Sequence, residues 1–170
     1  MSKTQTCQSR RWVLALVNQS ESDQEVIVFD PEKCTGCTYC MVSCSFKHYR
    51  STDFGKSHIK ILNDPVRRKS HFIGIHCVHC EDPLCLASCP VEAITKDTVT
   101  GLVRINASRC IGCKACILAC PISNPSFDEE RRIAVKCDFC DGTPQCVKFC
   151  ATEALKKTTR GLARRQFTKS

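Results

Sequence analysis

Sixteen of the 17 cysteines in this chain of 170 residues fall into four short groups, and no other feature restricts its fold so strongly. The first group reads CTGCTYCMVSC, which places four thiols within eleven residues. Thiols at this density serve as disulfides, zinc ligands, haem attachment points or ligands of iron–sulfur clusters. The groups are motif I (Cys34, Cys37, Cys40, Cys44), motif II (Cys77, Cys80, Cys85, Cys89), motif III (Cys110, Cys113, Cys116, Cys120) and motif IV (Cys137, Cys140, Cys146, Cys150).

The spacing within the groups favours iron–sulfur clusters. Motifs I and III have the C-x2-C-x2-C-x3-C spacing of bacterial ferredoxins, and Pro121 completes the pattern after motif III. Three thiolates two residues apart fit a tight loop around one cubane cluster, whereas the fourth is expected to begin a helix that leads to a second cluster. Motifs II and IV keep the opening and closing spacing and lengthen only the middle gap. The sequence therefore predicts four [4Fe-4S] clusters.

Disulfides, haem and zinc explain the pattern less well. Disulfides need an oxidising compartment, and the apolar run at residues 12–17 is too short for a secretory signal. Residues 9–14 resemble a twin-arginine export signal. The preferred interpretation is a β-strand at residues 12–17. Haem attachment needs C-x-x-C-H, which does not occur here. Zinc sites are built from C-x2-C pairs and need neither a third cysteine nor a closing C-x3-C in every group. Zinc therefore remains the weaker alternative.

The basic composition does not require a nucleic acid partner. The formal charge is +8 at pH 7, but this count treats every cysteine as neutral. Four oxidised cubane clusters with cysteine ligands would contribute about −8, which balances the surplus of Lys and Arg. The basic runs at residues 67–69 and 164–165 are therefore expected to be solvated or to contact a partner protein.

The order of the motifs predicts which cysteines share a cluster. In two-cluster ferredoxins each motif gives its fourth cysteine to the cluster of the other motif. Motifs II and III follow one another in this way, and motifs I and IV are left to make the same exchange around them. The predicted ligand sets are Cys34, Cys37, Cys40 and Cys150 for cluster 1; Cys137, Cys140, Cys146 and Cys44 for cluster 2; Cys110, Cys113, Cys116 and Cys89 for cluster 3; and Cys77, Cys80, Cys85 and Cys120 for cluster 4.

This exchange predicts an α+β fold made of two nested bacterial-ferredoxin-like (dicluster) halves, with short strands and helices around the clusters. Strands are expected in EVIVF, GLVRIN and RRIAVK, a turn or short helix in VEAI, and a hairpin from HIKIL and HFIGI. The expected units are an N-terminal arm and strand (1–25), an outer half with the hairpin (26–71 plus 134–155), an inner half (72–133) and a basic tail (156–170), either disordered or laid on a partner.

Several side chains beside the ligands are candidates for tuning the clusters. A nearby cation favours the reduced cluster, although most such lysines are expected to act only as surface charges: Lys33, Lys47, Lys114, Lys136 and Lys148. Apolar residues inside the motifs are expected to exclude water from the clusters: Met41, Val42, Ile111, Ile117, Leu118 and Phe149. The histidines near the motifs (His48, His58, His76, His79) are expected to support the sites without ligating metal, and Cys7 to be an ordinary thiol.

The four-motif order resembles the four-cluster electron-transfer subunits of the dimethyl sulfoxide reductase type, which accompany molybdenum and tungsten enzymes. The resemblance covers about residues 25–155 and all sixteen motif cysteines. It implies the same cluster pairing, and Cys113 stands where some relatives have Trp and hold a three-iron cluster. Three stretches are most similar to the small subunits of tungsten aldehyde oxidoreductases, a group that includes tungsten-dependent benzoyl-coenzyme A reductase complexes. They are CTGCTYCMVSCSFKHY, HCVHCEDPLCLASCPVEAITKD and VKCDFCDGTPQCVKFC.

These observations predict a non-catalytic electron-transfer subunit. The sequence has no phosphate-binding loop, nucleophile motif or dinucleotide fingerprint, and no stretch of transmembrane length. The resemblance implies a large catalytic subunit with a tungsten or molybdenum cofactor as partner, and a ferredoxin or a flavin/NAD subunit as further donor or acceptor. We expect a cytoplasmic protein without a membrane anchor or nucleic acid partner. The alternatives are a free-standing polyferredoxin shuttle and, more weakly, a zinc-binding nucleic-acid-binding module.

Overall fold

The computed structural model describes residues 23–64, 66 and 71–167. Cys7, the strand expected at residues 12–17 and the twin-arginine-like stretch lie outside these residues. The strands are β1 (Glu25–Phe29), β2 (Lys60–Asn63), β3 (Phe72–Ile75), β4 (Ile94–Lys96), β5 (Val103–Ile105), β6 (Ser126–Asp128), β7 (Ile133–Val135) and β8 (Leu155–Thr159). The α-helices are α2 (Tyr39–Tyr49), α3 (Leu84–Ala87), α4 (Ala115–Ala119), α5 (Gln145–Lys148) and α6 (Arg160–Phe167), with 3-10 turns at Phe54–Lys56 and Phe139–Gly142.

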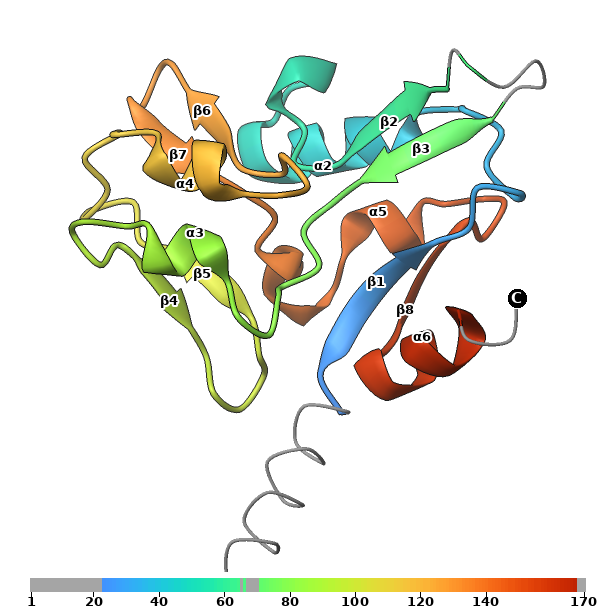
Figure 1. Ribbon diagram of the computed structural model, residues 1–170. Helices are drawn as coiled ribbons and strands as arrows, with labels where there is room; N and C mark the ends of the chain where they lie inside the picture. The colour runs from blue at the N-terminus through green and yellow to red at the C-terminus, as the bar shows by residue number, and fades with distance from the viewer. Residues whose placement is uncertain (1–22, 65, 67–70, 168–170) are drawn as a thin grey trace, which may run out of the picture.

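The strands of the described residues form four separate two-stranded antiparallel sheets (Figure 1). β1 pairs with β8, so that Glu25 lies opposite Thr159 and the two ends of the described chain come together. β2 pairs with β3, β4 with β5 and β6 with β7, each as a local hairpin. The hairpin expected from HIKIL and HFIGI and the strands expected in EVIVF, GLVRIN and RRIAVK are therefore confirmed. The α+β class is confirmed as well.

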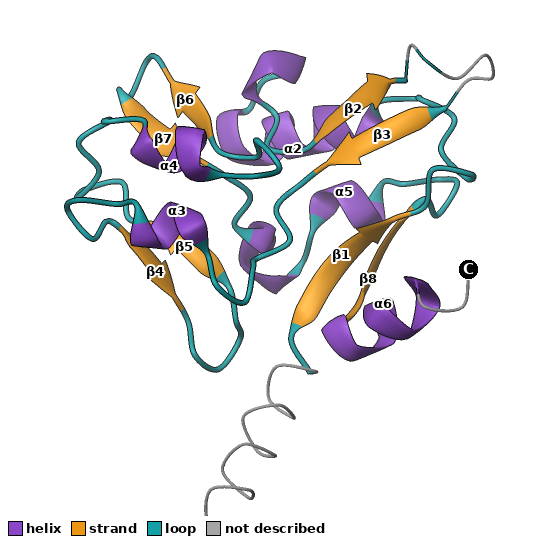
Figure 2. Ribbon diagram, viewed as in Figure 1, coloured by secondary structure: helices purple, strands orange, loops and turns teal. Residues whose placement is uncertain are grey.

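Two helix pairs bring the cysteine motifs together across the chain. α2, which carries the end of motif I, packs on α5 of motif IV. α3 of motif II packs on α4 of motif III. Figure 2 shows these short helices facing the middle of the molecule, with the strand pairs outside them. Most of the secondary structure therefore holds the loops that carry cysteines and does not form an extended sheet.

The order of the elements reveals a tandem repeat. A strand, a cysteine loop, a helix, a hairpin, a second cysteine loop, a helix and a strand follow one another from β1 to β4, and again from β5 to β8. Equivalent turns make equivalent hydrogen bonds: the Asn106 N–H donates to the Ala93 carbonyl at 2.7 Å, and the Asp30 N–H to the Ala154 carbonyl at 2.8 Å. The last strand of each repeat pairs with the first strand of the other, so the two repeats interlock.

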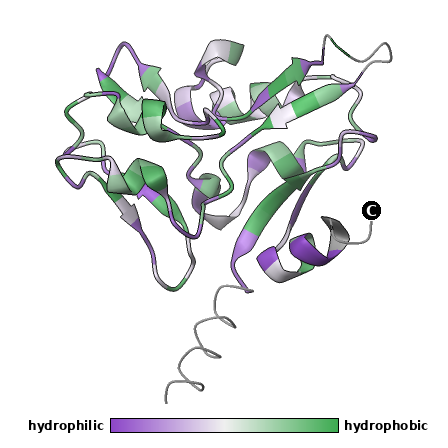
Figure 3. Ribbon diagram, in the orientation of Figure 1, coloured by the Kyte–Doolittle hydropathy of each residue, from purple (hydrophilic) through white to green (hydrophobic). Residues whose placement is uncertain are grey.

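The apolar core is small and is divided into two clusters. The larger one lies around Ile27, Met41, Ile59 and Phe139, and the smaller one around Val103. Figure 3 shows that β1 and β3 are among the most hydrophobic segments. Several residues of both clusters are themselves motif cysteines: Cys40, Cys44, Cys116 and Cys146. No helix in the described part of the chain is long and apolar enough to cross a membrane.

VEAI forms a turn that leads into β4, which is one of the two forms expected for it. Two other local expectations from the sequence are wrong. The helices of motifs I and III begin one residue before the third cysteine, at Tyr39 and Ala115, and not at the fourth. Residues 156–167 are not a disordered tail: they complete β8 and form α6, which packs on β1 and β8. Burial of Ala163 in this packing explains why a segment with little apolar content is ordered.

Candidate iron–sulfur centres

All sixteen motif cysteines are free thiols, and no disulfide joins them. Two small cavities are each lined by four of these thiols. The first cavity contains Cys34, Cys37, Cys40 and Cys150, which is the set predicted for cluster 1. The second contains Cys110, Cys113, Cys116 and Cys89, which is the set predicted for cluster 3. Each cavity thus presents four thiols, the number of cysteine ligands that one cubane cluster takes.

The other eight thiols are also close enough to influence one another. Burial raises the pKa of Cys146, and negative charge on Cys137, Cys44 and Cys140 acts in the same direction. Burial raises the pKa of Cys85, which the charges of Cys77, Cys120 and Cys80 increase further. The structure thus gathers the sets predicted for clusters 2 and 4 around Cys146 and Cys85 respectively.

The environment of the thiols favours a bound cation. Burial raises the pKa of Cys40 and of Cys137 to about 12, and that of Cys116 to about 11. In all three, burial is the largest influence on the pKa. Neighbouring thiolates add to each of these shifts. A group of buried thiolates is therefore unfavourable without positive charge between them, and iron supplies such charge. The residues present fit an iron–sulfur cluster.

Backbone N–H groups are directed at several of the sulfur atoms. Burial acts to raise the pKa of Cys89, but backbone N–H groups following it outweigh burial and lower this pKa. Hydrogen bonds to ligand sulfur stabilise its negative charge, which makes a cluster easier to reduce. Among the described residues such bonds run from Ala93 to Cys89 (3.2 Å), His58 to Cys44 (3.3 Å), His79 to Cys77 (3.4 Å), Leu155 to Cys150 (3.4 Å) and Ala134 to Cys110 (3.5 Å).

The tight loops of motifs I and III depend on left-handed backbone conformations. Gly36 and Gly112 have φ values of 69° and 70°, and Thr38 and Lys114, just before the helices, have 61° and 63°. Positive φ is accessible to glycine without steric cost, and it curls the loop so that successive thiols point to one centre. At Gly112 an added Cβ would lie 2.4 Å from the backbone carbonyl oxygen of Arg132.

Gly112→Ala is therefore expected to disrupt the third cluster. The clash involves backbone atoms that cannot rotate away, so the loop must move and its thiols with it. We expect the iron content of anaerobically purified protein to fall by about four atoms of about sixteen, the share of one cubane. Gly142→Ala is the matched control, because Gly142 has a φ of 93° but no atom within 4 Å of the added Cβ. Equal iron in both variants would show that the loop geometry does not matter.

The centre of the molecule is occupied by His79 and Phe139. Their rings meet edge to face with centroids 5.7 Å apart, and both residues are 1% exposed. Each is the third residue of an opening C-x2-C, so they are equivalent in the two repeats. Burial, followed by the charge of Lys136, lowers the pKa of His79 to about 3, so the imidazole is neutral. Its Nδ1 accepts a hydrogen bond from the Val103 N–H at 3.0 Å, which places the proton on Nε2.

The Nε2 atom of His79 is buried and has no protein partner. A buried N–H donor without an acceptor is costly, and a sulfide of a bound cluster would satisfy it. This observation is a further point of fit between the chain and an iron–sulfur centre. His76 connects motif II to β1, because its Nε2 forms a hydrogen bond of 2.8 Å with the Ile27 carbonyl.

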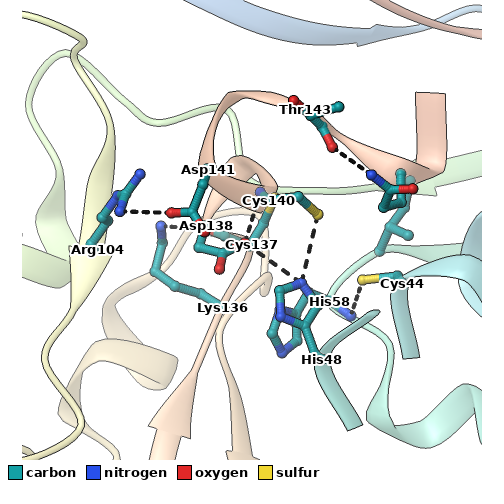
Figure 4. A network of polar contacts seen from close by, with 12 residues as sticks. Cys44, His48, His58, Arg104, Lys136, Cys137, Asp138, Cys140, Asp141 and Thr143 are labelled. Atoms are coloured by element: carbon teal, nitrogen blue, oxygen red, sulfur yellow. Dashed lines mark hydrogen bonds and ion pairs between the residues drawn. The ribbon is translucent and has the colours of Figure 1, made fainter. Parts of the chain in front are cut away.

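His48 and His58 lie beside the sulfur atoms of motifs I and IV, as Figure 4 shows. The two rings contact each other at a tilt of 32° with centroids 4.4 Å apart. The Nε2 atom of His48 is 3.7 Å from the Cys140 sulfur and 3.5 Å from Asp138. Burial, followed by the neighbouring His48, lowers the pKa of His58 to about 4. Asp138 was not singled out from the sequence, although its position directly after Cys137 places it beside a predicted ligand.

Only one of the five candidate lysines is buried. Lys136 is 5% exposed, and its Nζ donates to the backbone carbonyls of Val103 at 2.5 Å and Cys137 at 2.9 Å. The other four have exposed surroundings: Lys33 pairs with Asp30, Lys114 and Lys148 lie over the rings of Phe127 and Phe149, and Lys47 is exposed on α2. Most of these lysines are therefore surface charges, as expected, and Lys136 is the exception.

The expectation for the apolar motif residues is only partly met. Met41 is buried, and Ile117 packs against the smaller core cluster. Ile111 lines the cavity of the third set although it is 63% exposed. Leu118 and Phe149 are 87% and 52% exposed, so the prediction that they exclude water within this chain is wrong. Leu118 on α4 and Phe149 directly after α5 point outward, because the neighbouring cysteines occupy the inward side.

Comparison with known proteins places the chain in a family. The profile of the 4Fe-4S dicluster domain matches residues 68–160, and that of a 4Fe-4S binding domain matches residues 26–49. Among curated proteins, the aliphatic sulfonate oxidoreductase polyferredoxin-like subunit of Pyrococcus furiosus is 38% identical over 82% of this chain and 82% of its own length. The thiosulfate reductase electron transfer subunit PhsB of Salmonella typhi is 32% identical over 79% and 76%.

Two further matches are less complete. The NADH-dependent phenylglyoxylate dehydrogenase subunit beta of Aromatoleum evansii is 36% identical over 78% of this chain, which spans only 30% of that relative. A chain of the active site complex BamBC of benzoyl coenzyme A reductase as isolated aligns with a TM-score of 0.46 at 26% identity, over 80% of this chain and 77% of that chain. The family profile covers more than half of the chain and includes three of its four cysteine groups. The chain belongs to the 4Fe-4S dicluster domain family of ferredoxin-like proteins.

Proposed function

We propose that this chain is a non-catalytic electron-transfer subunit that relays single electrons through four [4Fe-4S] clusters. The observation that carries the proposal is that four thiols line each of two cavities, and that the other eight thiols lie near one another around Cys146 and Cys85. The ligand sets are those predicted from the sequence, shared between two nested halves at residues 26–71 plus 134–155 and 72–133. Each bound cluster supplies one reversible one-electron step.

The neighbouring sets are close enough to form a continuous path. Cys40 of the first set acts on the pKa of Cys146 in the second. Cys77 of the fourth set acts on Cys137 of the second, and Cys85 of the fourth on Cys116 of the third. These electrostatic influences between neighbouring sets support the order cluster 1, cluster 2, cluster 4, cluster 3. Clusters 1 and 3 are then the two ends of the relay, and Cys37 and Cys113 at these ends are both exposed.

The protein residues have two tasks in this relay. The backbone N–H groups and Lys136 stabilise negative charge on the ligands, which sets how readily each centre accepts an electron. The buried His79 and Phe139 keep water out of the space between the second and fourth sets. A chain with these tasks needs a donor at one end and an acceptor at the other.

We propose a catalytic subunit with a tungsten or molybdenum cofactor as one partner, in anaerobic metabolism. A ferredoxin or a flavin/NAD subunit is proposed as the second partner. The relatives named as an electron transfer subunit of thiosulfate reductase and as a polyferredoxin-like subunit of an oxidoreductase support a subunit role. A cytoplasmic setting suits sixteen reduced thiols. A free-standing polyferredoxin is the second candidate, and co-purification of a large cofactor-bearing subunit from the native source would argue against it.

Metal analysis of anaerobically purified protein tests the central proposal. Four cubane clusters predict about sixteen iron and about sixteen acid-labile sulfide per chain, without stoichiometric zinc. Replacing all four cysteines of motif III by serine should remove about eight iron, because two clusters each lose ligands. Zinc at about four per chain without sulfide would contradict the relay and favour the zinc-binding, nucleic-acid-binding alternative.

A further inference from the structure

α2 and α5 leave an aromatic groove open on the surface. Residues 39, 42, 43, 46 and 50 of the α2 segment recur at helical spacing and form one stripe. Tyr39 is 62% exposed, Phe46 is 52% exposed, and Phe149, directly after α5, is 52% exposed. Together with Val42, Ser43, Lys47, Arg50 and Gln145 these side chains line the groove. Three large aromatic side chains left open to water on one face are typical of a protein contact site.

Two polar side chains of the groove are already hydrogen-bonded within the chain. The Ser43 hydroxyl donates to the Cys40 carbonyl at 3.0 Å, and the Gln145 side-chain amide donates to the Thr143 carbonyl at 3.0 Å. The Ser43 hydroxyl and the Gln145 amide N–H are therefore engaged, whereas an apolar side chain would find three aromatic surfaces. The groove consequently fits a segment of another protein better than a metabolite.

The charge around the groove is of one sign. Arg50 lies over the Phe46 ring at 5.6 Å, and Lys148 lies over the Phe149 ring at 5.9 Å. Lys47 is exposed on the same helix. No Asp or Glu lines the groove, and neither α2 nor α5 contains one. A partner that places carboxylates around an apolar side chain would match both features.

The groove also lies beside one end of the proposed relay. α2 carries Cys40 and Cys44, α5 carries Cys146, and Phe149 directly precedes Cys150. We propose that this groove is the docking face for an acidic redox protein, which inserts an apolar side chain between Phe46 and Phe149 while its carboxylates meet Lys47, Arg50 and Lys148. The proposal rests on the proposed electron-transfer function, and it assigns the face through which cluster 1 exchanges electrons.

Binding of an acidic plant-type [2Fe–2S] ferredoxin to the anaerobically purified full chain tests the proposal. We expect the dissociation constant to rise at least tenfold for Lys47→Glu with Arg50→Glu, and at least tenfold for Phe46→Ser. Raising the salt concentration should weaken wild-type binding more than that of the charge variant. The matched controls are Arg109→Glu with Arg132→Glu, which change the charge equally on the other repeat, and Val99→Ser, which changes an 86% exposed apolar residue. Both controls should bind as the wild type does.

Several results would overturn this assignment. They are an absence of wild-type binding, equal affinities for the groove and control variants, and self-association of the chain that Phe46→Ser abolishes. Iron and sulfide are measured on every sample. With about sixteen iron present, failure of the binding result removes the docking face and leaves the relay intact. If the wild type contains no iron or sulfide, the proposed function itself has failed.

Discussion

Removal of iron is expected to abolish the cooperative unfolding transition of this protein. Within the described part of the chain the strands form only two-stranded sheets, and an isolated pair of strands is marginally stable in water. Of the side chains in the two core clusters, several are cysteines whose sulfur atoms would bind iron: Cys40, Cys44, Cys116 and Cys146. Metal–thiolate bonds can contribute on the order of 10 kcal/mol to the folding of small domains. A loss of folding free energy of this size exceeds the stabilisation that the two small core clusters can supply without iron.

The measurement compares holo protein with protein stripped of iron by an oxidant and a chelator under anaerobic conditions. Circular dichroism should show a sigmoidal thermal transition for the holo form and a gradual slope for the stripped form. Amide exchange should lose protection even in β1 and β8, which close the two ends of the chain. Reconstitution with iron and sulfide should restore the transition. A stripped protein that keeps the holo midpoint would show that the core suffices without metal.

The sequence predicted the parts of this fold that depend on short-range patterns. The strands at 25–29, 103–105 and 133–135 and the hairpin of β2 and β3 follow from alternating apolar residues and turn residues. The four thiol groups follow from cysteine spacing alone. The resemblance to four-cluster subunits rested on the same cysteines, and the 4Fe-4S dicluster profile confirms its iron–sulfur part.

Features that depend on long-range packing could not be predicted in the same way. β1 and β8 are separated by most of the chain, and the interlocked repeats became visible only through their pairing. α6 is ordered because it packs on this distant pair, although its own residues are largely polar. The groove on α2 and α5 arises because Phe46 and Phe149 from different motifs meet at one surface. Local composition carries no information about contacts between residues that are far apart in the sequence.

Lys136→Met is expected to lower the reduction potentials of the two central clusters. Lys136 is the buried member of the five candidate lysines, and its two hydrogen bonds go to uncharged backbone carbonyls. An ammonium group buried without a carboxylate needs another source of negative charge. Burial raises the pKa of Cys85, and Lys136 is the strongest influence in the opposite direction. It also opposes the raised pKa of Cys137, so its charge reaches the fourth and the second ligand sets.

A positive charge favours the cluster that has gained an electron, so its removal should make reduction harder. We expect the reduction equilibrium of clusters 2 and 4 to fall by about tenfold, which is about 59 mV for a one-electron couple. Clusters 1 and 3, at the ends of the relay, should change much less. Redox titration monitored by electron paramagnetic resonance measures these potentials directly. Iron content is determined in parallel, because a structural defect would release iron and leave fewer clusters to titrate.

Three further variants separate charge from packing. Lys136→Gln keeps a hydrogen-bond donor but loses the charge, so its potentials should match those of Lys136→Met. Lys136→Arg keeps the charge and should stay near the wild type. Lys33→Met removes a lysine that is half exposed and pairs with Asp30, and solvent screening should leave the potentials unchanged. If Lys136→Gln retained wild-type potentials while Lys136→Met did not, the hydrogen bonds to Val103 and Cys137 would be responsible, and the position would tune the relay through geometry instead of charge.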